Sequence, residues 1–235
     1  MEIKKQLSKI YYGWPVPLRV ALDNIFNPPP HLNSQSGREK IVRDVFGTLP
    51  LEVVIETGTF RGGSTGFFAS TFGIPVYSVE LDPTYHEYSK RRLRNFAQIY
   101  FSQGDSREFL RRLSSQTNLT SKFAFFYLDA HWWDDLPLLE EIQIVRKHWK
   151  RFVVLVDDFK VSGDAGYEYD DYGVGKVLEL ECFPELKDMN LGCFFPSLPS
   201  SEESGLRRGC VVFSDHETGS KLRGLNSLCE HPLGA

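Results

Sequence analysis

Three aspartates stand where two apolar stretches of the chain end. Asp129 closes the stretch Phe123–Asp129, while Asp157 closes the stretch Phe152–Asp157 and Asp158 follows it. If these stretches are neighbouring parallel strands, their ends lie about 4.8 Å apart and the three carboxylates can converge. Clustered carboxylates repel one another unless protons or a cation intervene, and oxygen ligands favour a hard cation such as Mg²⁺. We therefore predict a divalent-metal site here; the alternative is helix capping or surface loops.

A histidine lies beside this predicted metal site, because His131 follows Asp129 by two residues. Its imidazole titrates near neutral pH and could act as a general base that removes a proton from a hydroxyl group. We therefore predict that His131 and Asp129 are the catalytic residues, with Lys160 as a second candidate for the base. The alternatives for His131 are a hydrogen bond to a loop carbonyl group and stacking on a bound adenine.

A glycine-rich turn, with the sequence ETGTFRGGS over residues 56–64, follows the first apolar stretch and precedes a predicted helix. Doubly wound α/β folds bind nucleotides at such a turn. A dinucleotide fingerprint needs a glycine where Phe60 stands. The carboxylate of Glu56 would repel a pyrophosphate but would suit the ammonium group of an amino-acid moiety. The predicted cofactor-binding residues of this turn are Glu56, Gly58, Thr59, Gly62 and Ser64.

Further acids follow the next two apolar stretches. Glu80 ends the second stretch, 22 residues after Gly58, where an acid accepts hydrogen bonds from ribose hydroxyl groups. Asp105 and Ser106 follow the third stretch and could hydrogen-bond the edge of an adenine. The alternative is that Glu80 and Asp105 cap the helices that follow them. Together with the glycine turn, these positions predict an adenosyl cofactor.

The elements that must position these residues alternate along the chain from residue 51. Short apolar runs without polar alternation indicate strands that are covered on both faces, and their alternation with helices indicates a parallel sheet. The predicted strands are Glu52–Glu56, Val76–Glu80, Gln98–Ser102, Phe123–Asp129 and Phe152–Asp157. The predicted helices between them are Ser64–Thr71, Pro83–Phe96, Ser106–Leu113 and Leu136–Trp149.

The pattern becomes irregular after Asp158. Residues 161–175 are rich in glycine, tyrosine and acids and are predicted to form a long loop at the same sheet edge, where lids usually lie. Residues 176–181 are predicted to form a short helix. Two further strands, Met189–Phe195 and Gly209–Ser214, have no helix between them and must pair antiparallel.

The expected fold is therefore an α/β, Rossmann-like, seven-stranded, mostly parallel sheet with helices on both faces and a C-terminal antiparallel hairpin. The first fifty residues contain two predicted helices, Pro17–Phe26 and Arg38–Phe46. We expect residues 1–50 to form an N-terminal helical arm or cap and residues 51–235 to form the cofactor-binding domain. The arm is a candidate interface for a homodimer.

Composition excludes several classes of function. The 235 residues carry 27 basic and 31 acidic side chains, and a net charge of −4 is unsuited to a general nucleic-acid binder. No run approaches the roughly 20 apolar residues of a membrane span, and the N-terminus lacks the apolar core of a secretory signal. The four cysteines form no C-x-x-C pair and are expected to be reduced thiols. We expect a cytoplasmic protein with no membrane partner.

The motif E-x-G-x-x-x-G-x-S at residues 56–64 resembles the first motif of class I S-adenosylmethionine (SAM)-dependent methyltransferases, particularly the metal-dependent catechol O-methyltransferase-like group. The resemblance covers roughly residues 50–160. It implies the strand order 3-2-1-4-5-7-6, with the terminal hairpin at one edge. It also implies that Glu80 holds the ribose of SAM and that the region of Gly58 faces its methionine part.

The resemblance also implies metal ligands at Asp129, Asp157 and Asp158, although the catechol group usually has asparagine at the last position. The Asp-Asp pair is closer to macrocin-type sugar O-methyltransferases, so catechol, sugar diol and other acceptors stay open. We expect a SAM-dependent, divalent-metal-dependent O-methyltransferase acting on a hydroxyl group of a small molecule, such as a sugar, phenol or natural product. The alternatives are a metal-independent N- or C-methyltransferase and a catalytically silent SAM-binding module.

Overall fold

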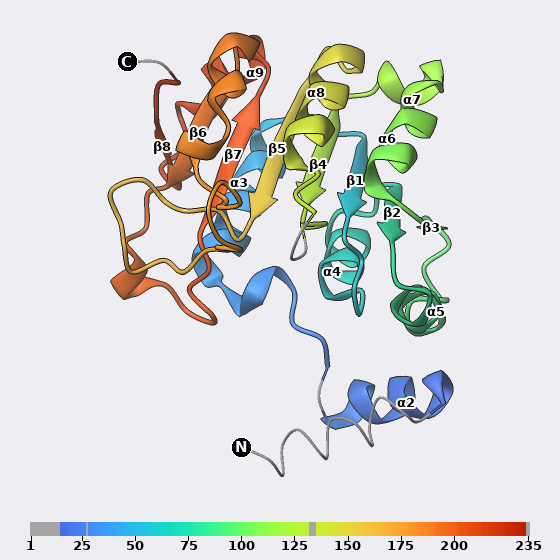
Figure 1. Ribbon diagram of the computed structural model, residues 1–235. Helices are drawn as coiled ribbons and strands as arrows, with labels where there is room; N and C mark the ends of the chain where they lie inside the picture. The colour runs from blue at the N-terminus through green and yellow to red at the C-terminus, as the bar shows by residue number, and fades with distance from the viewer. Residues whose placement is uncertain (1–14, 27, 132–134, 234–235) are drawn as a thin grey trace.

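The computed structural model describes residues 15–26, 28–131 and 135–233 (Figure 1). Within these residues, eight strands form one sheet in the order β3-β2-β1-β4-β5-β7-β6-β8. The strands are β1 Val53–Thr57, β2 Val76–Glu80, β3 Ile99–Gln103, β4 Ala124–Leu128, β5 Phe152–Asp157, β6 Gly192–Pro196, β7 Cys210–Ser214 and β8 Leu228–Glu230.

The first five strands are parallel to one another, and β7, β6 and β8 continue the sheet antiparallel. This confirms the expected fold class and the strand order that the resemblance implied. The number of strands is eight rather than seven. The sequence pattern missed β8, because a three-residue strand at the sheet edge, with two of its residues exposed, has no extended apolar run.

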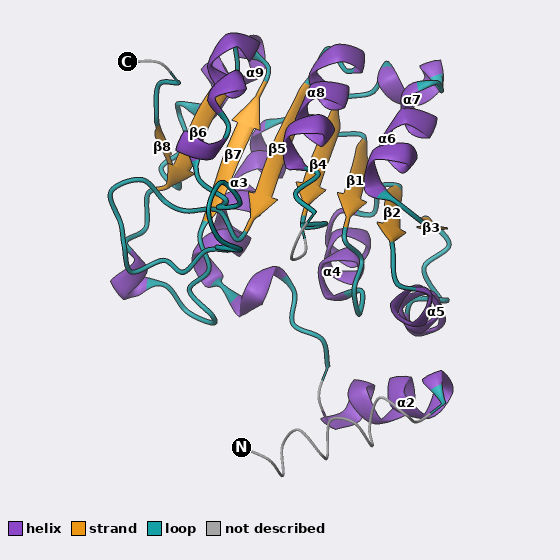
Figure 2. Cartoon of the chain, viewed as in Figure 1, coloured by secondary structure: helices purple, strands orange, loops and turns teal. Residues whose placement is uncertain are grey.

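Helices cover both faces of the sheet (Figure 2). The described helices are α2 Val16–Phe26, α3 Ser36–Thr48, α4 Gly63–Phe72, α5 Pro83–Arg92, α6 Ser106–Ser114, α7 Thr117–Thr120, α8 Leu138–His148 and α9 His216–Leu222. Strand β4 shows why both faces are apolar, because Ala124, Phe126 and Leu128 pack in one core with α6 and α8. Phe125 and Tyr127 point the other way, into a second core with α3 and α4.

The segment after β5 folds differently from the sequence prediction. The short helix expected at residues 176–181 is wrong, because Asp171 and Val177 form an antiparallel bridge and Leu178 donates its N–H to the Asp170 carbonyl at 3.0 Å. These pairings hold the chain extended. Only short 3₁₀ turns follow, at η2 Leu180–Cys182 and η3 Pro184–Met189, and η4 Ser200–Glu202 lies between β6 and β7.

The two helices of the N-terminal segment are used differently. Helix α3 packs against the sheet through Ile41, Val42 and Val45, all almost fully buried. Helix α2 lies farther from the sheet and packs on α5 (Figure 1). Between them, the one-turn helix η1 Leu32–Ser34 runs toward the carboxyl ends of the strands. A division into an arm of residues 1–50 and a domain of residues 51–235 stays a prediction.

The described helices include none that is both long enough and apolar enough to cross a membrane.

Candidate cofactor and metal site

The glycine turn after β1 packs directly against the end of β4. Gly58 has φ of +86°, and a Cβ atom there would lie 2.1 Å from the carbonyl oxygen of Asp129. A side chain is therefore excluded on two grounds, the left-handed backbone and the close approach. Gly62 is also left-handed, with φ of +72°, and precedes the first turn of α4. The cofactor-binding residues and the acidic residues predicted from sequence thus meet at one sheet edge.

Glu56 lies beneath this turn, with 1% of its surface exposed. Its carboxylate accepts hydrogen bonds from the hydroxyl groups of Thr65 and Ser78, each at 2.5 Å. The hydroxyl of Thr59 lies 2.5 Å from that of Ser78 and extends the chain of polar contacts. Burial raises the pKa of Glu56 to about 7, against the effect of these hydrogen bonds. The carboxyl group can therefore change its charge near neutral pH.

Glu80 holds the turn from the end of β2. Its carboxylate accepts the backbone N–H of Phe60 at 2.6 Å and that of Asp82 at 2.9 Å. Partial burial raises its pKa. The hydroxyl of Ser64 accepts the backbone N–H of Leu32 at 3.2 Å, so this predicted cofactor residue also binds the N-terminal segment.

Asp105 is the N-cap of α6, where its carboxylate accepts the backbone N–H groups of Arg107 and Glu108. The Arg107 guanidinium, 2.5 Å from the carboxylate, lowers the pKa of Asp105 to about 2. Ser106 is largely buried at the first position of the same helix. The helix-capping alternative is thus present in the structure, and contact of these residues with an adenine stays a prediction.

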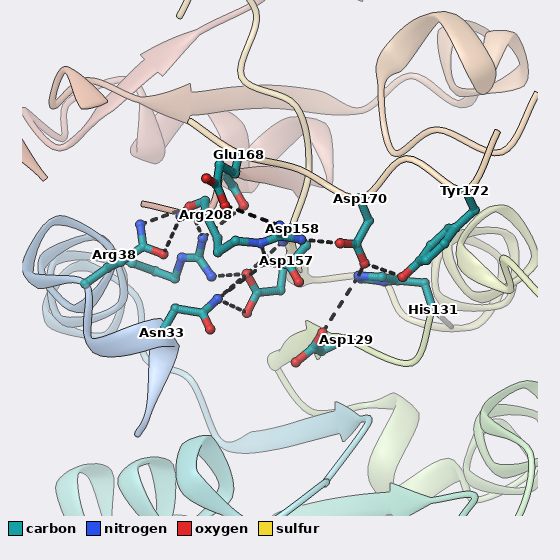
Figure 3. A network of polar contacts seen from close by, with 12 residues as sticks. Asn33, Arg38, Asp129, His131, Asp157, Asp158, Glu168, Asp170, Tyr172 and Arg208 are labelled. Atoms are coloured by element: carbon teal, nitrogen blue, oxygen red, sulfur yellow. Dashed lines mark hydrogen bonds and ion pairs between the residues drawn. The ribbon is translucent and has the colours of Figure 1, made fainter. Parts of the chain in front are cut away.

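Three side chains come together as candidate metal ligands at the sheet edge: Asp129, His131 and Asp158 (Figure 3). One ligand atom from each lies within 4.8 Å of the others. His131 Nε2 is 3.7 Å from Asp129 Oδ1 and 3.6 Å from Asp170 Oδ2. The His131 side chain is 3% exposed, and its Nε2 has no hydrogen-bond partner among the described residues. A buried ring nitrogen in this state is suited to a ligand or a transferred proton.

Asp157, which the sequence analysis placed in the metal site, does not join this group. It is the last residue of β5, and its carboxylate forms an ion pair with Arg38 of α3 and accepts the Tyr127 hydroxyl. The Asn33 amide lies 3.2 Å from both of its oxygens. These buried partners occupy Asp157, whereas the candidate ligands that lie together are Asp129, His131 and Asp158; a metal site at this edge stays a prediction. Asp158 has φ of +54°, and its carboxylate lies 3.4 Å from the same Asn33 amide nitrogen.

Two residues near the candidate ligands, Arg208 and Asn33, were not predicted from the sequence. Arg208 donates from Nε to Asp158 at 2.8 Å and from Nη2 to Asp170, within the cluster drawn in Figure 3. Asn33 reaches Asp157 and Asp158 from a turn in which residues 32–34 all have positive φ. No spacing along the chain signals either contact, although asparagine is among the residues that adopt left-handed backbone most readily.

Charge at this edge favours occupation by a cation. Enclosure of Asp129 and the neighbouring Asp158 raise the pKa of Asp129 well above its usual range, although 36% of its side chain is exposed. Burial lowers the pKa of His131 against the opposite effect of Asp158 and Asp170, so the neutral imidazole is favoured. The carboxyl groups of Asp129, Asp158 and Asp170 and the guanidinium of Arg208 lie together at this edge. A divalent cation bound there would displace the proton from Asp129.

Comparisons in sequence find no relative: no protein-family model matches the chain, and no curated protein matches it. Comparison of structures does find similar folds. An O-methyltransferase from Bacillus cereus, in complex with SAH, has a TM-score of 0.58 and 14% identity over 92% of this chain and 97% of its own. The O-methyltransferase TomG from Streptomyces achromogenes, involved in tomaymycin synthesis and solved with SAM, has a TM-score of 0.56 and 15% identity over 85% and 89%.

A third similar structure is the glycopeptide N-methyltransferase MtfA complexed with sinefungin. Its TM-score is 0.51, with 15% identity over 82% of this chain and 89% of its own. Methylation of oxygen and of nitrogen therefore both occur on this architecture among the similar structures. At identities this low, the structural similarity establishes the fold alone. The chain has the fold of the class I SAM-dependent methyltransferases.

Proposed function

We propose that this protein is a SAM-dependent O-methyltransferase that requires a divalent cation and acts on a hydroxyl group of a small molecule, such as a sugar, phenol or natural product. The observation that carries the proposal is the buried Nε2 of His131, which lies beside Asp129 and Asp158 and has no hydrogen-bond partner among the described residues. This polar group lies at the same edge as the glycine turn, since Gly58 packs on Asp129. Two of the similar structures are O-methyltransferases, which supports the proposal.

The cofactor would lie over the glycine turn. Glu80 would accept the ribose hydroxyl groups, since each of its oxygens retains a lone pair after accepting one backbone N–H. Ionised Glu56 would attract the ammonium group of the methionine part. Gly58, Thr59, Gly62 and Ser64 would form the surrounding turn. Asp129 and Asp158 would hold Mg²⁺ or a similar ion, with His131 adjacent.

Methyl transfer depends on alignment of the acceptor oxygen with the methyl group, so placement contributes much of the rate. A bound cation would lower the pKa of a coordinated hydroxyl group. His131 is then the proposed base, because burial favours its neutral form and leaves Nε2 able to take a proton. The same atom could instead bind the cation, and a His131→Ala variant separates these roles. If His131 is the base, the rate of the wild type rises with pH along a limb that His131→Ala removes, while metal affinity stays unchanged.

A metal-independent methyltransferase is the second candidate. The Arg208 guanidinium, bonded to Asp158 and Asp170, already supplies positive charge at this edge. In that case the aspartates would only bind and orient the acceptor. Titration calorimetry with S-adenosylhomocysteine, with and without Mg²⁺ and a diol, distinguishes the two.

We expect S-adenosylhomocysteine to bind the wild type, and Mg²⁺ and a diol to strengthen each other's binding. Chelation with EDTA should abolish turnover, and Mg²⁺ should restore it. Asp129→Asn should lose the Mg²⁺ response, whereas the control Asp44→Asn, at an exposed ion pair on α3, should keep it. Full turnover with metal verified absent would favour the second candidate. No binding of S-adenosylhomocysteine would refute both.

A further inference from the structure

Helix α2 contributes a buried acid to the glycine turn. Its Asp23 is 3% exposed and accepts the hydroxyl of Tyr88, on α5, at 2.6 Å. The same carboxylate forms an ion pair with Arg61 at 2.8 Å. Arg61 lies between Phe60 and Gly62, within the turn that follows β1. An ion pair therefore joins α2, which packs on α5 away from the sheet, to the predicted cofactor-binding turn (Figure 1).

The surroundings of this ion pair are protein rather than solvent. Tyr88 is fully buried, and the guanidinium groups of Arg61 and Arg19 lie over its ring at 5.6 Å and 5.7 Å from the centroid. Only 13% of the Arg61 side chain and 4% of the Asp23 side chain are exposed. Removing the charge of Asp23 would leave the Arg61 guanidinium enclosed without this carboxylate, which favours movement of Arg61 toward water.

Movement of Arg61 would disturb the turn, because its two neighbours have constrained backbones. Phe60 has φ of +48°, which is unfavourable for a residue with a side chain, and is held by the hydrogen bond of its N–H to Glu80. Gly62 has φ of +72°, and its carbonyl accepts Nη1 of Arg92 at 2.9 Å. The turn is thus tethered at three successive residues, and the middle tether comes from α2.

We propose that Asp23 is a positioning residue: through Arg61, helix α2 holds the glycine turn in the conformation that binds the cofactor. Asp23 need not touch the cofactor, and its effect should appear in cofactor affinity rather than in the methyl-transfer step. The inference rests on the proposed function for the identity of the cofactor. The effect on the turn itself can be measured without any ligand.

The test compares Asp23→Asn with the control Asp44→Asn, which removes the charge of a half-buried aspartate on α3. In the free protein, hydrogen exchange at the amides of Phe60 and Gly62 should be at least several-fold faster in Asp23→Asn and unchanged in the control. The dissociation constant of S-adenosylhomocysteine should rise about tenfold, the equivalent of about 1.4 kcal/mol. Turnover at saturating SAM should stay within about twofold. A merely destabilised protein would not show this split between affinity and rate.

Two further variants distinguish an effect on the turn from a general defect in folding. Tyr88→Phe keeps the buried ring and removes only the hydroxyl that bonds Asp23, so it should give a smaller shift in the same direction. Asp23→Asn combined with Arg61→Met should bind S-adenosylhomocysteine no more weakly than Arg61→Met alone, since both changes break one contact. Unchanged exchange in folded Asp23→Asn, or additive losses in the double variant, would overturn the proposal. Faster exchange in Asp23→Asn together with no binding of S-adenosylhomocysteine by the wild type would refute only the proposed cofactor.

Discussion

At the scale of single residues, two kinds of buried polar group occur near the carboxyl edge of the sheet. Glu56 has hydroxyl donors on its carboxylate, from Thr65 and Ser78. His131 Nε2, by contrast, has no hydrogen-bond partner in the described part of the chain. A satisfied buried group specifies local structure, whereas an unsatisfied one carries a free-energy penalty that a ligand can relieve. Because of this difference, we infer that His131 lies at the centre of the candidate site.

The pH dependence of cofactor binding follows from Glu56. Burial raises its pKa to about 7, so its carboxylate is mostly ionised at pH 8 and mostly neutral at pH 6. If the ionised form attracts the ammonium group, the dissociation constant of S-adenosylhomocysteine should rise about tenfold from pH 8 to pH 6. Glu56→Gln should flatten this profile, as measured by calorimetry at both pH values. A wild-type affinity that is independent of pH would contradict the role of Glu56.

The same shift has the opposite sign for the stability of the free protein. The folded state binds this proton more tightly than the unfolded chain, whose carboxyl titrates near 4.5. The raised pKa therefore does not lower the free energy of unfolding below pH 4.5, where the carboxyl is neutral in both states. It lowers this free energy progressively as the pH rises from there through about 7. The stability of the wild type relative to Glu56→Gln should fall over this window, which separates folding effects from binding effects.

At the scale of elements, α3 anchors the N-terminal segment to the sheet edge. Arg38 is 1% exposed, forms an ion pair with Asp157 at the end of β5, and donates from Nη2 to the Gly209 carbonyl before β7 at 2.9 Å. A single side chain therefore connects α3 to two neighbouring strands. Because Asp157 immediately precedes Asp158, this contact also fixes the position of a candidate metal ligand.

Arg38→Leu should lower the free energy of unfolding by about 3–5 kcal/mol, because it leaves the buried Asp157 carboxylate without its cation. Chemical denaturation measures the loss. The control Lys40→Ala removes an exposed pair with Asp44 on the same helix and should cost no more than about 0.5 kcal/mol. Adding Asp157→Asn to Arg38→Leu should recover part of the loss. Equal stabilities of Arg38→Leu and Lys40→Ala would show that the buried pair contributes nothing.

At the scale of the whole molecule, α2 presents apolar side chains to solvent on the side away from Arg19 and Asp23. Leu18 is 47% exposed and Ile25 is 71% exposed, with the exposed Ala21 between them at helical spacing. Exposed apolar side chains that share one helix face are typical of an interaction surface. A homodimer through the N-terminal segment stays a prediction, and this face is where it can be tested.

The combined substitutions Leu18→Glu and Ile25→Glu should therefore convert a dimer to a monomer, as measured by light scattering after size-exclusion chromatography. The control Val174→Glu places a charge at a fully exposed apolar residue, remote from α2 in sequence, and should leave the mass unchanged. Repulsion and loss of apolar contact both act against association of the variant. A concentration of about 100 µM lies well above the dissociation constants of stable dimers. A wild type that is monomeric at this concentration would make the prediction wrong.

The sequence by itself predicted most strands of the sheet and the edge at which the candidate site residues lie. Val76–Glu80 and Phe152–Asp157 form strands with the predicted bounds, because an uninterrupted apolar run between polar residues is a local signal. The glycine turn could also be predicted from the sequence, since Gly58 and Gly62 occupy backbone conformations that glycine adopts at least cost. The sequence also placed Asp129 and His131 at the carboxyl edge of the sheet, directly after β4.

Only the tertiary structure decided which acidic groups belong together. Asp157 and Asp158 are adjacent in sequence, yet the first binds Arg38, 119 residues away, and the second binds Arg208, 50 residues away. Whether a carboxylate is free to hold a cation depends on these distant partners. Sequence patterns report periodicity within an element, whereas charge pairing across a sheet edge depends on how separate elements pack, and no short-range pattern encodes that packing.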